Sequence, residues 1–534
     1  MISEALQQFA DKNENLIGLL YNIIVDVSII SIKFYAYLML LAVVYYTLAR
    51  KFKLQWTVLM LASLFFYLAN GRQAAFWTFL PLTVTYLAAR ASTGLNGSRK
   101  SLLTFAVVTF NVLFLIYFKE SNFFIHIVNS IFMHSGHPLL EEVSRKAPFG
   151  ISYITLMLIS YYLDISWGIT EQQKNPFKFL ACIIFFPITS SGPVVRYAQI
   201  KSTLFETHNF DYEHFCLGCQ RILWGFFKKY LIANRIAIIV NNIYADESAT
   251  GIIVLAGLLL VAMQIYFDFS ACMDMVLGAG ELFGISLPEN FKQPFYATNL
   301  SEFWRRWHIT LGLWVKDYVL YPILKSRSIQ LLSEFLKKKL GKKNRYAKLI
   351  PTWTGTFIMW FIVGFWHGGE WNFIFGSGLF FFFMICGGQL LSPLFGKLTA
   401  AFRINTDCSA WKCFQTVRTA FLFAASVSFD RTDFRNGFRM WHRAFTDFFN
   451  FSAATYMKGF ELNDIIILLV LIPFVFLLEA REFKTDDNTV WLKAIAKKNI
   501  IVRWAVYSAL IYATILLGSY ASGFNAADFI YMGF

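Results

Sequence analysis

GIIVLAGLLLVAMQIYFDFSACMDMVL, at residues 251–277, is an almost unbroken run of apolar side chains. A helix needs about 20 such residues to cross a membrane, so this run predicts a spanning helix. The chain of 534 residues repeats the pattern, since 57% of it is hydrophobic and only 15% is charged. Ordinary soluble domains carry roughly a quarter charged residues. The composition excludes a disordered protein and argues against a soluble enzyme.

Runs of this kind predict an all-α polytopic membrane protein with about twelve spanning helices. They lie at 33–49, 54–70, 74–90, 101–118, 149–168, 216–243, 251–277, 350–366, 371–395, 415–429, 462–478 and 502–520. Shorter apolar pieces at 15–30, 178–190 and 301–322 are interrupted by charge, Pro or Gly. Such interruptions favour interfacial or re-entrant helices over spanning ones.

Charges in the connecting segments predict the orientation of the spans, because Lys and Arg are retained on the cytoplasmic side. Arg50 and Lys51 follow the first run and basic residues also follow the third and fifth, whereas Asp246 and Glu247 follow the sixth. With an even number of spans, both termini are expected outside the cytoplasm. The predicted parts are an extracytoplasmic or interfacial segment 1–32, one transmembrane domain 33–522 and an extracytoplasmic tail 523–534.

The formal charge of +15 has two interpretations, a nucleic-acid surface or the cytoplasmic bias of a membrane protein. The positive charge is densest at 325–348, where the segment contains many Lys and Arg residues and only one acidic residue, Glu334. We predict a basic cytoplasmic loop there. The loop is either a topology anchor that touches anionic membrane lipids, or a docking surface for CoA or an acidic acyl carrier protein. Nucleic acid is not needed as a partner to explain the charge.

Signatures of soluble enzymes and metal sites are missing from the sequence. The chain has no P-loop, no H-E-x-x-H and no correctly spaced dinucleotide fingerprint. Cys216 and Cys219 form a C-x-x-C without a second pair, so neither zinc nor a disulfide framework is indicated. We expect no metal and no bound cofactor.

Ionisable groups inside apolar surroundings are costly and by default mark a functional site. Two segments concentrate them, SEFWRRWHITLGLWVKDYVLYP at 301–322 and GFWHGGEW at 364–371. On a continuous helix, His308 would share a face with the tryptophans of its segment. Glycines flank His367 and permit close approach of a substrate or a second backbone. A neutral imidazole can accept a hydroxyl proton during attack on a thioester, although either His could instead be a packing residue.

Seven motifs, spread in order over most of the chain, resemble one protein family. They are PFGISYITLMLISYYLDISWG (148–168), FFPITSSGPVVRY (185–197), RILWGFFKKYLIANR (221–235), QIYFDFSACMDM (264–275), LPENFKQPF (287–295), EFWRRWHITLGLWVKDY (302–318) and GFWHGGEWNFIFG (364–376). Together they resemble the bacterial branch of the membrane-bound O-acyltransferases (MBOAT), which includes the membrane subunits for alginate and peptidoglycan O-acetylation. The resemblance implies a ring of helices around a central tunnel in a thinned membrane.

The resemblance also implies roles for single residues. It implies that His367 is the catalytic histidine and that His308 is the second, donor-side polar position. The ending DFIYMGF resembles an aromatic motif of this branch whose tyrosine, here Tyr531, accepts the acyl group; the alternative is an interfacial aromatic anchor. The candidate substrate tunnel comprises Trp304, Arg305, Trp307, Asp317, Trp366, Glu370 and Asp268, the last also open to a purely structural hydrogen-bonding role.

The function predicted from these features is O-acyl transfer in a bacterial cytoplasmic membrane. The donor would be acetyl-CoA or an acyl carrier protein thioester, and the acceptor an extracytoplasmic cell-envelope polysaccharide, reached through an acyl-tyrosine and an SGNH-type partner transferase. D-alanyl transfer to teichoic acid from a carrier protein is the alternative. A transporter or flippase is less favoured, because its site commonly lies between two repeats and the chain shows no matching halves.

Overall fold

The computed structural model describes residues 30–69, 72–132, 139–145, 147–189, 191–449 and 460–520. These residues form helices and connecting segments without a strand, and the one isolated β-bridge among them joins Phe291 to Trp307. The all-α prediction is therefore confirmed. Each apolar run predicted to span the membrane is helical over most of its length.

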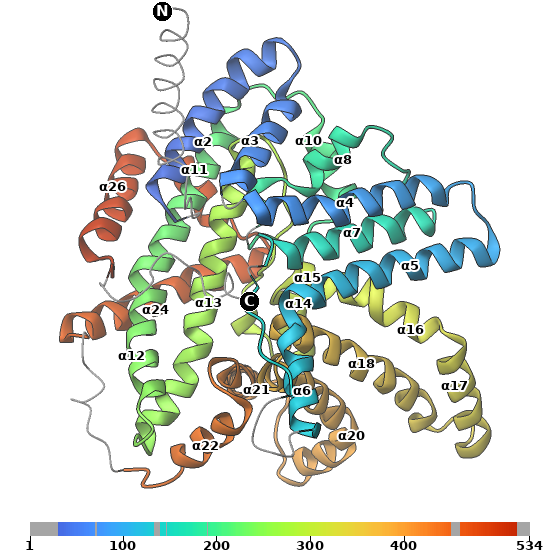
Figure 1. Ribbon diagram of the computed structural model, residues 1–534. Coiled ribbons are helices and arrows are strands. Elements are labelled where there is room, and N and C mark those ends of the chain that lie inside the picture. Colours follow the sequence, from blue (N-terminus) through green and yellow to red (C-terminus); the bar gives the residue numbers. More distant parts are fainter. Residues whose placement is uncertain are drawn as a thin grey trace, which may run out of the picture.

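Most helices before residue 205 lie on the upper and right-hand side of Figure 1, and α6 extends into its lower middle. They are α2 (Ile32–Val44), the π-helical η1 (Tyr45–Ala49), α3 (Gln55–Ala69), α4 (Arg72–Ser92), α5 (Gly97–Leu115), the π-helical η2 (Ile116–Glu120), α6 (Ser121–Phe132), α7 (Ile151–Ser166), α8 (Pro176–Ile183), α9 (Phe186–Thr189) and α10 (Tyr197–Leu204).

The helices of the middle part include the two segments that carry the candidate histidines. They are α11 (Tyr212–Phe227), η3 (Lys228–Ala233), α12 (Asn234–Ala245), α13 (Ile252–Glu281), η4 (Pro294–Tyr296), α14 (Leu300–Arg306), α15 (Ile309–Val315), η5 (Lys316–Leu320), α16 (Tyr321–Lys325), α17 (Arg327–Leu340) and α18 (Arg345–Gly368).

The remaining helices complete the wall around α13 and the outer edge of the molecule. They are α19 (Trp371–Phe373), η6 (Ile374–Leu379), α20 (Phe380–Ala401), α21 (Ser409–Val427), η7 (Ser428–Arg431), α22 (Phe434–Ala444), α24 (Leu462–Thr485), α25 (Val490–Ala496) and α26 (Ile500–Leu517).

Six helices among the described residues are long and apolar enough to cross a membrane. They are Gly97–Phe132, Ile252–Glu281, Arg345–Gly368, Trp371–Ala401, Leu462–Thr485 and Ile500–Leu517, and shorter apolar helices lie at Lys33–Ala49, Gln55–Leu68 and Ile151–Ser166. The protein is therefore a multi-pass membrane protein. A ring of about twelve spans, and the side on which each terminus lies, stay predictions.

Helix α13 is the centre of the fold. It is apolar on all sides, and such a helix is buried by other helices instead of facing lipid with one stripe. Figure 1 shows α11 and α12 end to end with α13 running beside both, and α21 also packs on α13. At the α11–α13 crossing the two backbones come close, because a Cβ atom at Gly218 would lie 2.8 Å from the carbonyl oxygen of Gly278. The close approach at this crossing therefore depends on two glycines facing each other.

The basic segment 325–348 differs from its prediction, because most of it is helix α17 and not a loop. Ser326 caps the N-terminus by accepting a hydrogen bond from the Ile329 amide at 3.5 Å, and no Pro or Gly interrupts the helix before Gly341. Ile329 is buried on the side that packs on α18, and the lysines near the C-terminus are exposed. Amphipathic spacing within the charged run produces the helix.

Candidate active site

His367 lies on the last turn of α18, at a point where α18 meets η6 backbone to backbone. A Cβ atom at Gly364 would lie 2.7 Å from the carbonyl oxygen of Phe373, so no larger residue fits there. Gly369 ends α18 in the left-handed conformation, with φ of 64°, and its amide bonds to the Phe365 carbonyl at 2.9 Å. These glycines hold the His367 side chain inside the protein, where it is 4% exposed.

His308 lies at a break between α14 and α15, so the prediction of one continuous helix is wrong at this position. Its φ of 45° is left-handed, a conformation that residues other than glycine adopt rarely. The break is fixed by pairing with the segment before η4, since the Ile309 amide donates to the Asn290 carbonyl at 3.0 Å. His308 is 1% exposed.

The two histidines come together inside an aromatic shell. Their ring centroids are 6.3 Å apart, and the Trp366 ring lies 5.1 Å from that of His367 and 6.4 Å from that of His308. The Phe269 ring of α13 contacts His308 edge-on at 5.0 Å. This distance places both imidazoles in one site, close enough for a single reacting group to meet both. Two residues far apart in sequence thus form one buried polar site.

The family model described as MBOAT, membrane-bound O-acyltransferase family, matches residues 23–337 of the 534 residues. The chain belongs to this family. The match covers more than half of the chain, including His308, and the resemblance predicted from the motifs is confirmed. MBOAT membership also agrees with the apolar helices of the structure.

Three relatives are similar to parts of this chain. It is 33% identical to the probable alginate O-acetylase AlgI of Pseudomonas putida over 258 residues, 47% of this chain and 50% of the relative. It is 30% identical to the peptidoglycan O-acetyltransferase of Helicobacter pylori over 354 residues, 59% of this chain and 61% of the relative. It is 29% identical to the teichoic acid D-alanyltransferase of Bacillus subtilis over 245 residues, 44% of this chain and 56% of the relative. The chain thus matches about half the length of the alginate O-acetylase.

The other two predicted aromatic residues of this MBOAT chain, Trp304 and Trp307, pack against rings of neighbouring helices. Trp304 lies edge-on to Trp360 and Phe381, with ring centroids 4.8 and 4.7 Å away. Trp307 is 1% exposed and its ring lies 4.5 Å from that of Phe423. Both tryptophans therefore belong to the wall of α14, α18, α20 and α21. Their part in a substrate tunnel stays a prediction.

The predicted charged residues are spread over several places. Arg305 is exposed, Asp317 pairs with Arg196 at 2.7 Å, and Asp268 pairs with Lys229 at 2.5 Å. The last pair is 2% exposed on each side, which agrees with the structural interpretation of Asp268. Glu370 lies three residues after His367, and its Oε1 is 3.5 Å from Nδ1 of His126. Tyr531 lies outside the described residues.

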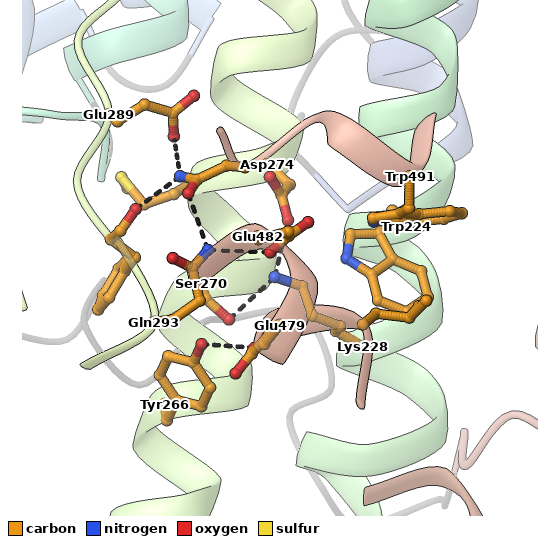
Figure 2. Close-up of a pocket in the computed structure, with 14 residues that line it drawn as sticks. Trp224, Lys228, Tyr266, Ser270, Asp274, Glu289, Gln293, Glu479, Glu482 and Trp491 are labelled. Atoms are coloured by element: carbon orange, nitrogen blue, oxygen red, sulfur yellow. Dashed lines mark hydrogen bonds and ion pairs between the residues drawn. The ribbon is translucent and has the colours of Figure 1, made fainter. Parts of the chain in front are cut away.

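Apart from the histidine pair, a polar pocket with a volume of about 40 Å³ lies between α11, α13 and α24 (Figure 2). Lys228 Nζ pairs with Asp274 Oδ2 at 2.7 Å and donates to Ser270 Oγ at 3.0 Å, and Tyr266 donates to Glu479 at 2.6 Å. These bonds tie three helices together. Within the part of the chain that the structure describes, no group of three or more His, Cys, Asp or Glu side chains is arranged to hold a metal ion.

Asn290 is a site residue that the motifs contained but that received no role. Its Oδ1 accepts hydrogen bonds from the Thr310 amide at 3.1 Å and the Thr310 hydroxyl at 2.9 Å, and it lies 3.2 Å from Nδ1 of His308. One buried side chain thus sets the turn and the ring orientation of His308. No local pattern indicated this role, because Asn290 lies between Glu289 and Phe291 and two residues before Lys292.

We expect Asn290→Ala to lower the free energy of unfolding by about 2 kcal/mol, because two buried donors of Thr310 lose their acceptor. The acyl-transfer rate should fall as well, since His308 is no longer oriented. Thermal unfolding in detergent measures the first effect. Asn405→Ala, at an exposed asparagine, is the control, and equal melting temperatures for the two variants would contradict the role.

Proposed function

We propose that this protein transfers an acyl group, acetyl in the first instance, from a cytoplasmic thioester to an extracytoplasmic cell-envelope polysaccharide. The observation that carries the proposal is the buried pair of His308 and His367, with ring centroids 6.3 Å apart. A buried imidazole without water around it is suited to moving one proton between reactants. Membership of the MBOAT family supports the reaction class.

In the proposed reaction, His367 Nε2 or Nδ1 accepts the proton of the acceptor hydroxyl as its oxygen attacks the thioester carbonyl carbon. A carbon–oxygen bond forms and the carbon–sulfur bond breaks. The imidazolium then returns the proton to the leaving thiolate, so atoms and charge balance without a metal or a covalent His intermediate. His308, with its ring centroid 6.3 Å from that of His367, orients the thioester.

The first acceptor in this proposal is Tyr531 on the tail, which passes the acyl group to an SGNH-type transferase outside the cytoplasm. Relatives named alginate O-acetylase and peptidoglycan O-acetyltransferase support acetyl as the group that is moved. The membrane would be the bacterial cytoplasmic membrane, with both termini outside. Three of the predicted tunnel residues, Trp304, Trp307 and Trp366, would line the path of the acyl group.

D-alanyl transfer from a carrier protein is the second candidate. The exposed lysines of α17 favour it, because an acidic carrier would dock on them, and one relative is named teichoic acid D-alanyltransferase. Inside-out membrane vesicles that contain the full chain would be supplied with acetyl-labelled acetyl-CoA or with a D-alanyl carrier thioester. We expect label on the protein and the polymer only from acetyl-CoA. Transfer from neither donor would refute acyl transfer and favour a transporter.

We expect the combined change Lys337→Gln, Lys338→Gln and Lys339→Gln to raise KM for acetyl-CoA about three- to tenfold, because three exposed cations no longer attract its phosphates. The effect on kcat should be small, and high salt should remove the difference between variant and wild type.

Lys51→Gln with Lys53→Gln is the control, since both residues are exposed on another basic segment. An unchanged KM in the α17 variant, together with weaker binding to anionic lipid, would identify α17 as a lipid anchor instead of a donor-docking surface.

A further inference from the structure

Lys119 connects the first half of the fold to the turn that carries His367. Its Nζ donates to the Trp366 carbonyl at 2.7 Å and to the His367 carbonyl at 3.4 Å. The same Nζ lies 5.5 Å from the centroid of the Trp366 ring. The Lys119 side chain is 13% exposed, so these bonds form in a largely dry environment.

The end of α18 explains why a lysine belongs there. The last four carbonyls of a helix have no partner within the helix, and they form the negative end of its dipole. In α18 the Gly369 amide satisfies the Phe365 carbonyl at 2.9 Å. The next two carbonyls, of Trp366 and His367, accept hydrogen bonds from the Lys119 ammonium. A cation from another helix thus completes the C-terminal cap of α18.

The local backbone of Lys119 is adapted to this contact. Lys119 and Glu120 end the π-helical turn η2, and π-turns insert an extra residue that redirects the side chains after it. Glu120 is 2% exposed, and its Oε1 lies 3.5 Å from Lys119 Nζ. Glu120 therefore balances the buried ammonium. A Cβ atom at Gly369 would collide with the Glu120 carboxylate. Lys119 and Glu120 therefore both contact the end of α18.

We propose that Lys119 is a positioning residue that fixes the last turn of α18 and thereby aims the His367 imidazole at the reacting atoms. The inference rests on the proposed role of His367 as the base. The hydrogen bonds of Lys119 go to backbone oxygens, so in this proposal it acts on the rate through the geometry of the helix end. A displacement of about 1 Å at a catalytic group can cost about a hundredfold in rate.

The test compares three variants of the full chain in lipid nanodiscs, with acetyl-CoA as the donor probe. Lys119→Met keeps the length of the side chain but removes its donors, and Lys119→Arg restores donors. Lys201→Met is the matched control, because Lys201 also donates one hydrogen bond, to Thr170 at 3.2 Å, and lies 5.7 Å from a ring centroid, that of Tyr197.

We expect Lys119→Met to lower kcat about 10- to 100-fold with KM for acetyl-CoA within about twofold of wild type. Lys119→Arg should recover most of kcat, and Lys201→Met should match wild type. A second readout needs no activity: mass spectrometry should find His367 carbethoxylated faster by diethyl pyrocarbonate in Lys119→Met than in wild type.

Unchanged kcat and unchanged His367 labelling in Lys119→Met would overturn the proposal. So would Lys119→Arg as slow as Lys119→Met, since the role depends on the donors. A wild-type protein that transfers no acetyl group would instead refute the proposed function, whereas faster His367 labelling in Lys119→Met would still support the positioning contact.

Discussion

His367→Ala is expected to lower the rate of acetyl transfer by about 10³-fold, within the 10²- to 10⁴-fold range of general-base catalysis. The imidazole is 4% exposed, and Ala leaves the buried site without its proposed proton acceptor. The helix end that carries it should persist, because Gly369 and the Lys119 contacts involve backbone atoms. Transfer of label from acetyl-CoA in membrane vesicles measures the rate, and thermal unfolding checks the fold.

His214→Ala is the control for this variant. The His214 side chain is 71% exposed and pairs with Asp211 on the same helix, so its loss should change neither rate nor stability. If His367→Ala retains full transfer, His367 is a packing residue and the proposed mechanism fails. If His367→Ala loses both activity and folded protein, the less disruptive His367→Gln decides, and it is expected to fold and to remain inactive.

The sequence allowed the membrane fold and the histidine pair to be predicted for different reasons. Apolar runs become helices because the bilayer forces every backbone group to be satisfied within its own segment. The runs at 101–118 and 251–277 therefore match α5 and α13 closely. His308 and His367 were found as ionisable groups amid apolar neighbours, and the resemblance to the MBOAT family paired them.

What was missed depends on contacts between distant segments. The helix pattern of 301–322 gave no sign of the break at His308, because the break is fixed by Asn290 and Phe291 from another part of the chain. Local helical propensity was overridden there by tertiary hydrogen bonds. The partner of Lys119 on α18 was equally hidden, although a charged pair at the end of an apolar run was a signal. For α17, the helical spacing of the apolar residues was present in the sequence, but it was overlooked because of the many lysines around it.

Tyr531→Phe is expected to reduce acylation of the envelope polymer at least about 10²-fold, because Phe has no hydroxyl that can carry the acyl group. Folding should be unaffected. In wild type, mass spectrometry of membranes supplied with labelled acetyl-CoA should find the label as an ester on the tail peptide, removable by hydroxylamine, and the variant should lack it.

Tyr520→Phe provides the matched control, since Tyr520 also lies near the C-terminus and its hydroxyl donates to the Thr514 carbonyl at 2.6 Å. It should keep both polymer acylation and the tail label. Full polymer acylation by Tyr531→Phe would reduce the tail to an aromatic anchor and leave His367 to act on the polymer acceptor directly. His367→Ala should block the loading of Tyr531, whereas Tyr531→Phe leaves the histidine site intact. If the acyl group passes through Tyr531, both variants lose the label on the tail and both lose acylation of the polymer. If it does not, Tyr531→Phe lacks the tail label but still acylates the polymer.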